Sequence, residues 1–229
     1  SFRNTNTISY DFKKLLNSKD HSLNLMLGHE YIITKERVNT NIIHGFPVNY
    51  MAEDAWRLST QGTPYMIKDY YSPDDKLLSF FGRANYNFKD KYLLSATFRA
   101  DASSKFSKEN RWGYFPSMSL GWRMSEEQFM KSLTFVDDLK LRASYGLTGN
   151  FRIPNYGALG QISYYSYVLG GTAPSVIKGA APSSMPNPGL SWEKTSQFNI
   201  GFDASLFTNR LTFGMDVYDS NTYDLLLDV

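Results

Sequence analysis

The chain has 229 residues and a formal net charge of +2, so it can form one large all-β unit or two small domains and shows no sign of a nucleic-acid partner. It has no cysteine, which excludes disulfide frameworks, cysteine zinc ribbons and thiol catalysis. Its mean hydropathy is −0.38, and no apolar run approaches the roughly 20 residues of a membrane helix, although membrane β-strands hide half of their residues from such a measure.

Segments in which apolar and polar residues alternate recur along the chain, and this period is that of a β-strand with one apolar face. In chain order, we expect eight strands at about residues 8–12, 23–31, 77–88, 92–101, 113–124, 139–148, 195–207 and 210–219. Two long segments rich in polar and aromatic residues, 34–76 and 149–191, interrupt this series. Tight turns are predicted at Asn17–Asp20, Lys89–Lys91 and Thr208–Asn209.

Two of the hairpins have a register that can be predicted, because a shift of one residue would move every side chain to the other face. Pairing Phe88 with Tyr92 puts all apolar residues of that hairpin on one side, and pairing Leu206 with Leu211 does the same for the last one. After the fifth strand, the sequence from Ser125 to Gln128 matches a capping box and predicts a short helix.

The two faces of the predicted strands differ in charge. From residue 77 to Val217, the apolar face carries no charged residue. The opposite face carries, among many Asn, Gln, Ser and Thr residues, the charged residues Arg83, Arg99, Asp101, Arg123, Lys140, Arg142, Asp203 and Asp216. The inner faces of a soluble β-sandwich are also free of charge, so this contrast alone leaves two fold classes open.

Three features favour a membrane barrel over a soluble sandwich. The predicted strands have about nine to twelve residues, closer to the ~9–11 of a tilted membrane strand than to the ~5–6 of soluble proteins. Aromatic residues flank the short turns, and the connections alternate between short and long, as in outer-membrane barrels. We therefore predict an all-β chain, with about eight strands of an antiparallel transmembrane β-barrel whose apolar face meets lipid and whose polar face lines a lumen.

The short turns also predict how much of a barrel the chain contains. With these turns in the periplasm, both ends of the eight-stranded segment lie outside the cell, whereas a complete bacterial barrel starts and ends in the periplasm. We therefore expect an internal part of a larger barrel. One alternative is an autonomous eight-stranded anchor or adhesin, in which side chains would fill the interior of the barrel. The other is a soluble carbohydrate-binding β-sandwich.

Four motifs resemble the SusC/RagA family of TonB-dependent transporters. They begin at Phe81, Arg111, Leu139 and Asn187 and read FGRANYNFKDKYLL, RWGYFPSMSLGWR, LKLRASYGLTGN and NPGLSWEKT. They occur in the order of the family, and the matching stretches cover about half of the chain. The chain departs from the family where Ala102 follows Asp101, since a glycine is usual there.

The resemblance implies a barrel of about 22 strands plugged by an N-terminal domain, with the plug and the remaining strands absent from this chain. It also implies a SusD-like surface lipoprotein as a lid, energy supplied through TonB, and uptake of oligosaccharides or peptides. The protein is then expected in the outer membrane of a Gram-negative bacterium, in contact with the lipid bilayer.

Residues that could carry covalent chemistry are few. Of the three histidines, His21 and His29 are about 26 Å apart along one strand at ~3.3 Å per residue, too far to share a metal or a substrate. The pairs Asp74–Asp75 and Asp137–Asp138 indicate solvated loop ends, although outward aspartates also suit calcium. We predict a protein that is not an enzyme, with no catalytic residue, no cofactor and no metal site.

Aromatic residues in the two long segments suit stacking on sugars or contact with a protein partner, and equally a core between loops. For the polar-face arginines, pairing with carboxylates across strands is the alternative to substrate contact. The predicted substrate or partner contacts are Trp56, Tyr70, Tyr71, Arg99, Asp101, Tyr164, Tyr165 and Tyr167.

Overall fold

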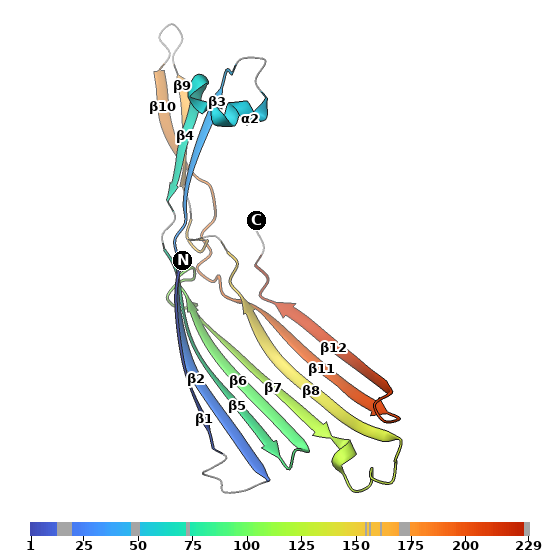
Figure 1. Ribbon diagram of the computed structural model, residues 1–229. Helices are drawn as coiled ribbons and strands as arrows, with labels where there is room; N and C mark the ends of the chain where they lie inside the picture. Colours follow the sequence, from blue (N-terminus) through green and yellow to red (C-terminus); the bar gives the residue numbers. More distant parts are fainter. Residues whose placement is uncertain are drawn as a thin grey trace.

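Figure 1 shows the computed structural model of the chain, which describes residues 1–12, 20–46, 51–71, 74–153, 155, 157–160, 162–169 and 175–226. One curved, antiparallel, eight-stranded sheet dominates it. In the order in which they pair, its strands are β1 (Phe2–Asp11), β2 (His21–Thr34), β5 (Asp75–Phe88), β6 (Tyr92–Ser103), β7 (Trp112–Arg123), β8 (Val136–Asn150), β11 (Glu193–Leu206) and β12 (Leu211–Tyr223). The strands therefore follow one another across the sheet as a meander.

Two hairpins project from one end of this sheet (Figure 1). The first pairs β3 (Arg37–His44) with β4 (Thr63–Tyr71), and the second pairs β9 (Ile162–Leu169) with β10 (Ser175–Pro182). Between β3 and β4 lie α2 (Ala52–Arg57) and the 3-10 helix η1 (Ser59–Gln61). We call this the long-loop end and the opposite end the short-turn end. Within the described ranges, no helix is long and apolar enough to cross a membrane.

The eight strands predicted from the alternation are those of the main sheet, whereas the two projecting hairpins were missed. Both fall in the segments 34–76 and 149–191, which were expected to be loops. The alternation is weak there for a physical reason: β3 packs neither face, since all but one of its residues are exposed. A strand without a buried face has no need of a two-residue period.

The predicted registers are correct. Phe88 pairs with Tyr92, and Leu206 with Leu211. Lys89 and Asp90 have φ angles of 54° and 53°, and the amide of Lys91 donates to the carbonyl of Phe88 at 3.0 Å. This is a type I′ turn, whose twist suits a two-stranded hairpin. Of the turn predicted at 17–20, only Asp20 lies within the described residues.

The apolar residues form continuous rows across the sheet. One row runs through Leu25, Ala84, Ala96, Met118, Tyr145 and Phe198, each paired with the next on the neighbouring strand. Many large side chains on this apolar face are exposed, for example Leu27 at 63% and Val217 at 56%. The sheet forms a single layer in Figure 1, so no second sheet covers this face, as it would in a sandwich.

The sheet is also open. Within the described part of the chain, β1 and β12 each pair on one side only, and they do not pair with each other. An autonomous barrel of eight strands would need that pairing to close. The arrangement therefore disagrees with the eight-stranded anchor as well as with the soluble sandwich.

A small core lies against the other, polar face, near the long-loop end. It consists of Phe106, Phe115, Ile153 and Trp192, of which Trp192 is only 3% exposed and donates its indole N–H to the carbonyl of Arg111 at 3.0 Å. The ring of Phe115 lies so close to Gly149 that a Cβ there would approach it to 2.0 Å. Three of the sequence motifs thus meet in this core, which explains their glycine and aromatic residues.

The helix predicted at Ser125–Gln128 is wrong. A 3-10 turn, η2 (Met124–Glu126), stands there instead, and the hydroxyl of Ser125 donates to the carboxylate of Asp138 at 2.8 Å rather than capping a helix. The carboxylate of Glu127 accepts hydrogen bonds from the Tyr92 hydroxyl at 2.8 Å and from the Lys91 ammonium at 3.2 Å. These contacts tie the segment to the β5–β6 turn and to β6.

Neutralising Glu127 should loosen the segment 124–135. The Tyr92 hydroxyl, followed by Lys91 and the Trp122 indole, holds the pKa of the Glu127 carboxyl below its ordinary 4.5. Because the ionised form is the one favoured in the folded state, this stabilisation should be present above about pH 4.5 and be lost as the pH falls through the lower folded pKa. Hydrogen-exchange protection of residues 124–135 should fall in that range, and Glu127→Gln should lack the protection at every pH.

Glu126→Gln is the matched control, because the neighbouring Glu126 carboxylate only lies 3.8 Å from the half-buried guanidinium of Arg123. It should leave the protection unchanged. Equal loss of protection in both variants would show that Glu127 does not anchor the segment.

Candidate functional site

The charged residues of the polar face gather mainly in two places, and the more buried one involves Glu30. Thr5, Glu30, Ser79 and Asp101 are paired in one row across β1, β2, β5 and β6. Glu30 is 9% exposed, Asp101 is 7% exposed, and Ser79 is fully buried. Together with Arg3 and Arg99, we call these four residues the Glu30 cluster, and it lies toward the long-loop end.

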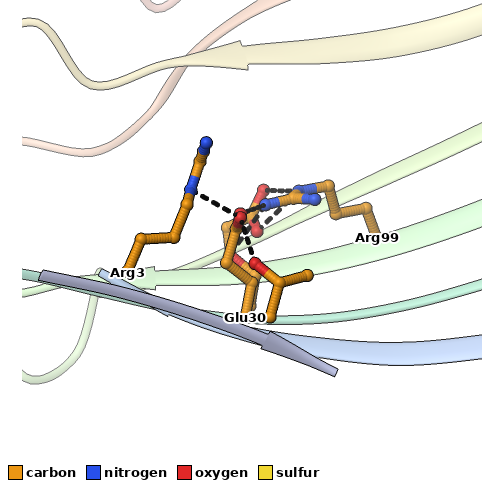
Figure 2. Close-up of polar contacts among 6 residues, drawn as sticks. Arg3, Glu30 and Arg99 are labelled. Atoms are coloured by element: carbon orange, nitrogen blue, oxygen red, sulfur yellow. Dashed lines mark hydrogen bonds and ion pairs between the residues drawn. The ribbon is translucent and has the colours of Figure 1, made fainter. Parts of the chain in front are cut away.

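Figure 2 shows the carboxylate of Glu30 between two guanidinium groups. Its Oε1 lies 2.9 Å from Nε of Arg3 and accepts a hydrogen bond from the Thr5 hydroxyl at 3.0 Å. Its Oε2 accepts one from Nη2 of Arg99 at 3.3 Å. Strands β1, β2 and β6 are therefore joined by charge-assisted bonds in addition to their backbone ladder.

Arg99 is positioned by the residues beneath it. Its Nε donates to the carboxylate of Asp101 at 2.9 Å and its Nη2 donates to the hydroxyl of Ser79 at 2.8 Å. Its guanidinium carbon also lies 5.4 Å from the centroid of the Phe81 ring. That ring occupies the space above Gly28, where a Cβ would approach it to 2.5 Å, so a glycine is required on β2 for Arg99 to lie as it does.

The sequence predicted Arg99 and Asp101 as contact residues, and the structure brings them together. It adds Glu30, Arg3 and Ser79, which the sequence analysis missed. The alternation in β2 places Glu30 on the polar face, but its meeting with Arg99 depends on the stagger of three strands. With two guanidinium groups facing two carboxylates, the cluster is balanced in charge, which favours the interpretation as cross-strand pairing.

The second group of charges lies on β8, β11 and β12. The guanidinium of Arg142 lies 2.8 Å from Asp203 through Nε and 3.2 Å from Asp216 through Nη2. It crosses over Gly201, where a Cβ would approach Oδ1 of Asp216 to 2.2 Å. Arg123 lies near Glu126 and Asp138. Among the residues that the structure describes, Arg83 bonds through Nε to the Thr97 hydroxyl alone, at 3.3 Å.

Between these two groups the polar face is lined by short neutral side chains. One row across six strands consists of Asn24, Asn85, Ser95, Ser119, Ser144 and Asn199. They all line one shallow hollow of about 460 Å³. Amides and hydroxyls can donate and accept hydrogen bonds at once, so this surface suits water, sugar hydroxyls or peptide groups.

The predicted aromatic contacts lie away from the Glu30 cluster, on the projecting hairpins (Figure 1). Trp56 lies in α2 and is 83% exposed. Tyr70 and Tyr71 lie on β4, opposite Val38 and Arg37. The three tyrosines of β9, Tyr164, Tyr165 and Tyr167, are paired with β10. The side chains of these five tyrosines lie outside the described part of the structure.

The titratable residues considered for chemistry are held apart or already paired. His21 bonds to the Tyr86 hydroxyl at 2.7 Å, whereas His29 lies near Asn6 on the same strand pair as Glu30 but on the other face. Asp75 pairs with Lys105 at 3.5 Å, and Asp137 accepts the amide of Asn209 at 2.9 Å. Among the residues that the structure describes, no three His, Asp or Glu side chains are grouped to hold a metal ion.

Comparison with known proteins identifies the family of the chain. The family model described as TonB dependent receptor-like, beta-barrel matches residues 1–229. The chain belongs to this family. It is 38% identical over its whole length to TonB-dependent receptor P39 of Formosa agariphila, and 42% identical over 69% of its length to TonB-dependent receptor SusC of Bacteroides thetaiotaomicron.

Among solved structures, the chain superimposes on that of the RagAB peptide transporter with a TM-score of 0.81, at 33% identity and over 99% of its length. It spans 21% and 16% of the two receptors and 24% of the solved chain. These relatives are named as receptors and a transporter, not as enzymes. The chain is thus an antiparallel part of a larger transmembrane β-barrel and is a SusC/RagA-type member of its family. In such a barrel the apolar face meets lipid and the polar face lines the interior.

Removing the guanidinium of Arg99 should destabilise the barrel, since it would leave the buried carboxylates of Glu30 and Asp101 without their shared partner. For Arg99→Met we expect a loss on the order of 3 kcal/mol, typical of a broken buried ion pair. A lower thermal unfolding midpoint of the folded barrel in detergent would show this, and adding Glu30→Gln should restore part of it.

Arg83→Met is the control, because Arg83 lies on the same face but is exposed and, within the described ranges, bonds to Thr97 alone. It should change the midpoint little. If Arg99→Met and Arg83→Met behaved alike, the Glu30 cluster would not carry the stabilisation assigned to it.

Proposed function

We propose that this chain forms part of the wall of a TonB-dependent importer that takes up oligosaccharides or peptides across the outer membrane of a Gram-negative bacterium. The observation that carries the proposal is that one sheet has a continuous apolar face and, opposite it, a polar face lined by Asn and Ser side chains. The chain that forms this sheet belongs to the TonB-dependent receptor family. The SusC and RagAB relatives support the import of a nutrient.

The working assembly contains more than this chain. The open edges at β1 and β12 would leave unpaired backbone groups in hydrocarbon, each of which costs several kcal/mol. Further strands must therefore complete the barrel in the membrane. A plug domain inside it would rest on the Asn and Ser side chains and on the two charge groups, and a force transmitted by TonB would move it.

The projecting hairpins form the outer surface of the proposed importer. Trp56 presents nearly its whole indole to solvent, and Tyr65 is also exposed, at 67%. Aromatic faces of this kind stack on sugars and anchor protein partners. We assign Trp56 and the tyrosines of β4 and β9 to contact with substrate or with a SusD-like surface lipoprotein, and Arg99 and Asp101 to the wall beneath them.

Lipid contact of the apolar face can be tested by one substitution in mid-strand. Ala96→Arg should cost about 2–4 kcal/mol of stability in the membrane, because the charge would enter hydrocarbon. The amount of folded barrel in the outer membrane should fall accordingly. Ser95→Arg is the control, since Ser95 lies one residue away on the polar face. A larger loss for Ser95→Arg would reverse the assignment of the two faces.

Import can be tested with the complete barrel protein in cells. Accumulation of labelled oligosaccharides or peptides should depend on this protein and cease when TonB is deleted, while the amount of protein in the outer membrane is unchanged. Trp56→Ala should weaken uptake or retention of the lipoprotein, with Arg57→Ala on the same helix as control. Uptake that persists without TonB would exclude active import.

A further inference from the structure

The membrane-facing side of the sheet contains a groove of about 780 Å³. Its floor is formed by residues with little or no side chain, Gly82 and Ala84 on β5 and Ala96 and Ala100 on β6. Its walls are Leu25 and Leu27 on one side, and Phe98 and Pro116 on the other. The groove is open to the membrane, and its volume is within the range of sites that bind small molecules.

The groove exists because large side chains stand on both sides of the small ones. Gly82 pairs with Leu27 on β2 and with Phe98 on β6, and a Cβ at Gly82 would approach Cδ2 of Leu27 to 3.1 Å. Ala84 pairs with Ala96 in the next row. Elsewhere on this face large residues occupy neighbouring strands, as Phe202 and Met215 do on β11 and β12.

Aromatic rings close the groove toward the long-loop end. The ring of Phe80 lies between those of His29 and Trp112, at 6.4 Å between centroids in each case, and Phe98 stacks on Tyr114 at 6.2 Å. Tryptophan and tyrosine are enriched where a barrel passes from hydrocarbon to headgroups. The end of the groove thus coincides with the headgroup level of the outer leaflet.

Polar groups lie directly beyond this aromatic rim, on the face that is otherwise apolar. Asn6 pairs with His29 and Asn4 pairs with Tyr31, and the Asn6 amide bonds to the Asn4 side chain and lies 3.4 Å from Nε2 of His29. Lys76, on the same face four residues from Phe80, is about 13 Å farther along β5 at ~3.3 Å per residue.

The charge around this rim is suited to an anion. Lys76 is exposed, and its ammonium makes no ion pair with a residue that the structure describes. The two aspartates that precede it in the sequence are already engaged, Asp74 with Lys35 at 3.6 Å and Asp75 with Lys105 at 3.5 Å. Toward the long-loop end, the apolar groove is therefore followed by hydrogen-bonding groups and then by a cation. A lipid has its acyl chains and its phosphate in the same order.

We propose that this groove holds an acyl chain of a phosphorylated lipid of the outer leaflet, with the lipid phosphate near Lys76 and His29. The lipid would fill the depression between β2 and β6 and be retained more tightly than the lipids around the rest of the barrel. This inference concerns the side of the wall opposite to the proposed import path, so it stands whether or not the substrate class is as proposed.

The test is native mass spectrometry of the complete barrel protein, extracted from its own membrane in a mild detergent. The parent protein should retain phosphorylated lipid. Ala84→Leu with Ala96→Leu fills the floor with apolar atoms and should lower the retained fraction about tenfold, the change produced by a loss of 1.4 kcal/mol in binding. Ala143→Leu with Ala204→Leu, on the membrane-facing side of β8 and β11, should leave it unchanged.

Lys76→Ala with His29→Ala should reduce retention of the phosphorylated lipid more than that of an uncharged lipid with the same chains. Heat-modifiable migration confirms that each variant is folded. Equal retention by the filled and control variants would overturn the proposal, and so would an equal fall of both lipids in the Lys76 and His29 variant. If the parent protein instead retained a second copy of itself, and the variant with the filled groove did not, the groove would be a contact between two barrels and the proposal would be wrong.

Discussion

A β-strand in a membrane wall has to present every second side chain to hydrocarbon while all of its backbone N–H and C=O groups are paired with neighbouring strands. The eight strands of the main sheet meet the first condition in continuous rows, from Leu25 on β2 to Phe198 on β11. Each inner strand pairs with a neighbour on both sides, although the β7–β8 ladder covers only Ser117–Arg123 of β7, whereas in the described part of the chain β1 and β12 pair on one side only. The chain is therefore stable in a bilayer only as part of a larger closed wall, and its size relative to the receptors it matches is in accord with this.

The same alternation places charges on the interior face, where they are paired rather than free. Arg99 and Arg142 each face two carboxylates. Glycines make room for both groups: the Phe81 ring beside Arg99 lies close to Gly28, and the Asp216 carboxylate bound by Arg142 lies close to Gly201. Removing Arg99 is costly because Glu30 and Asp101 stay buried, whereas Asp203 and Asp216 beside Arg142 are exposed. The two groups join strands at separate places, and a neutral surface of Asn and Ser side chains lies between them.

The long-loop end has a different role from the wall. The core of Phe106, Phe115, Ile153 and Trp192 closes the interior side of the sheet there, and the β3–β4 and β9–β10 hairpins extend beyond it. On the apolar face, aromatic rings gather at the same end, where those of Phe80 and Trp112 stack at 6.4 Å between centroids. The groove below these rings would make one lipid a defined part of the wall, next to the strands that carry the Glu30 cluster on their other face.

The sequence by itself determined the eight strands of the sheet, the registers at Lys89–Lys91 and Thr208–Asn209, and the two faces, because a strand exposed to two different media must alternate with a period of two. It also determined the family, since residues such as Gly113, Phe115, Gly149 and Trp192 must keep their identity to pack on one another. Only the tertiary structure decided which charges meet. Glu30 and Arg99 are 69 residues apart in sequence, and their contact depends on the stagger between strands and on the space above Gly28. The projecting hairpins were beyond prediction because β3 has no buried face that would impose alternation, and the turn at Met124–Glu126 was beyond prediction because contacts such as those of Glu127 hold that segment in place.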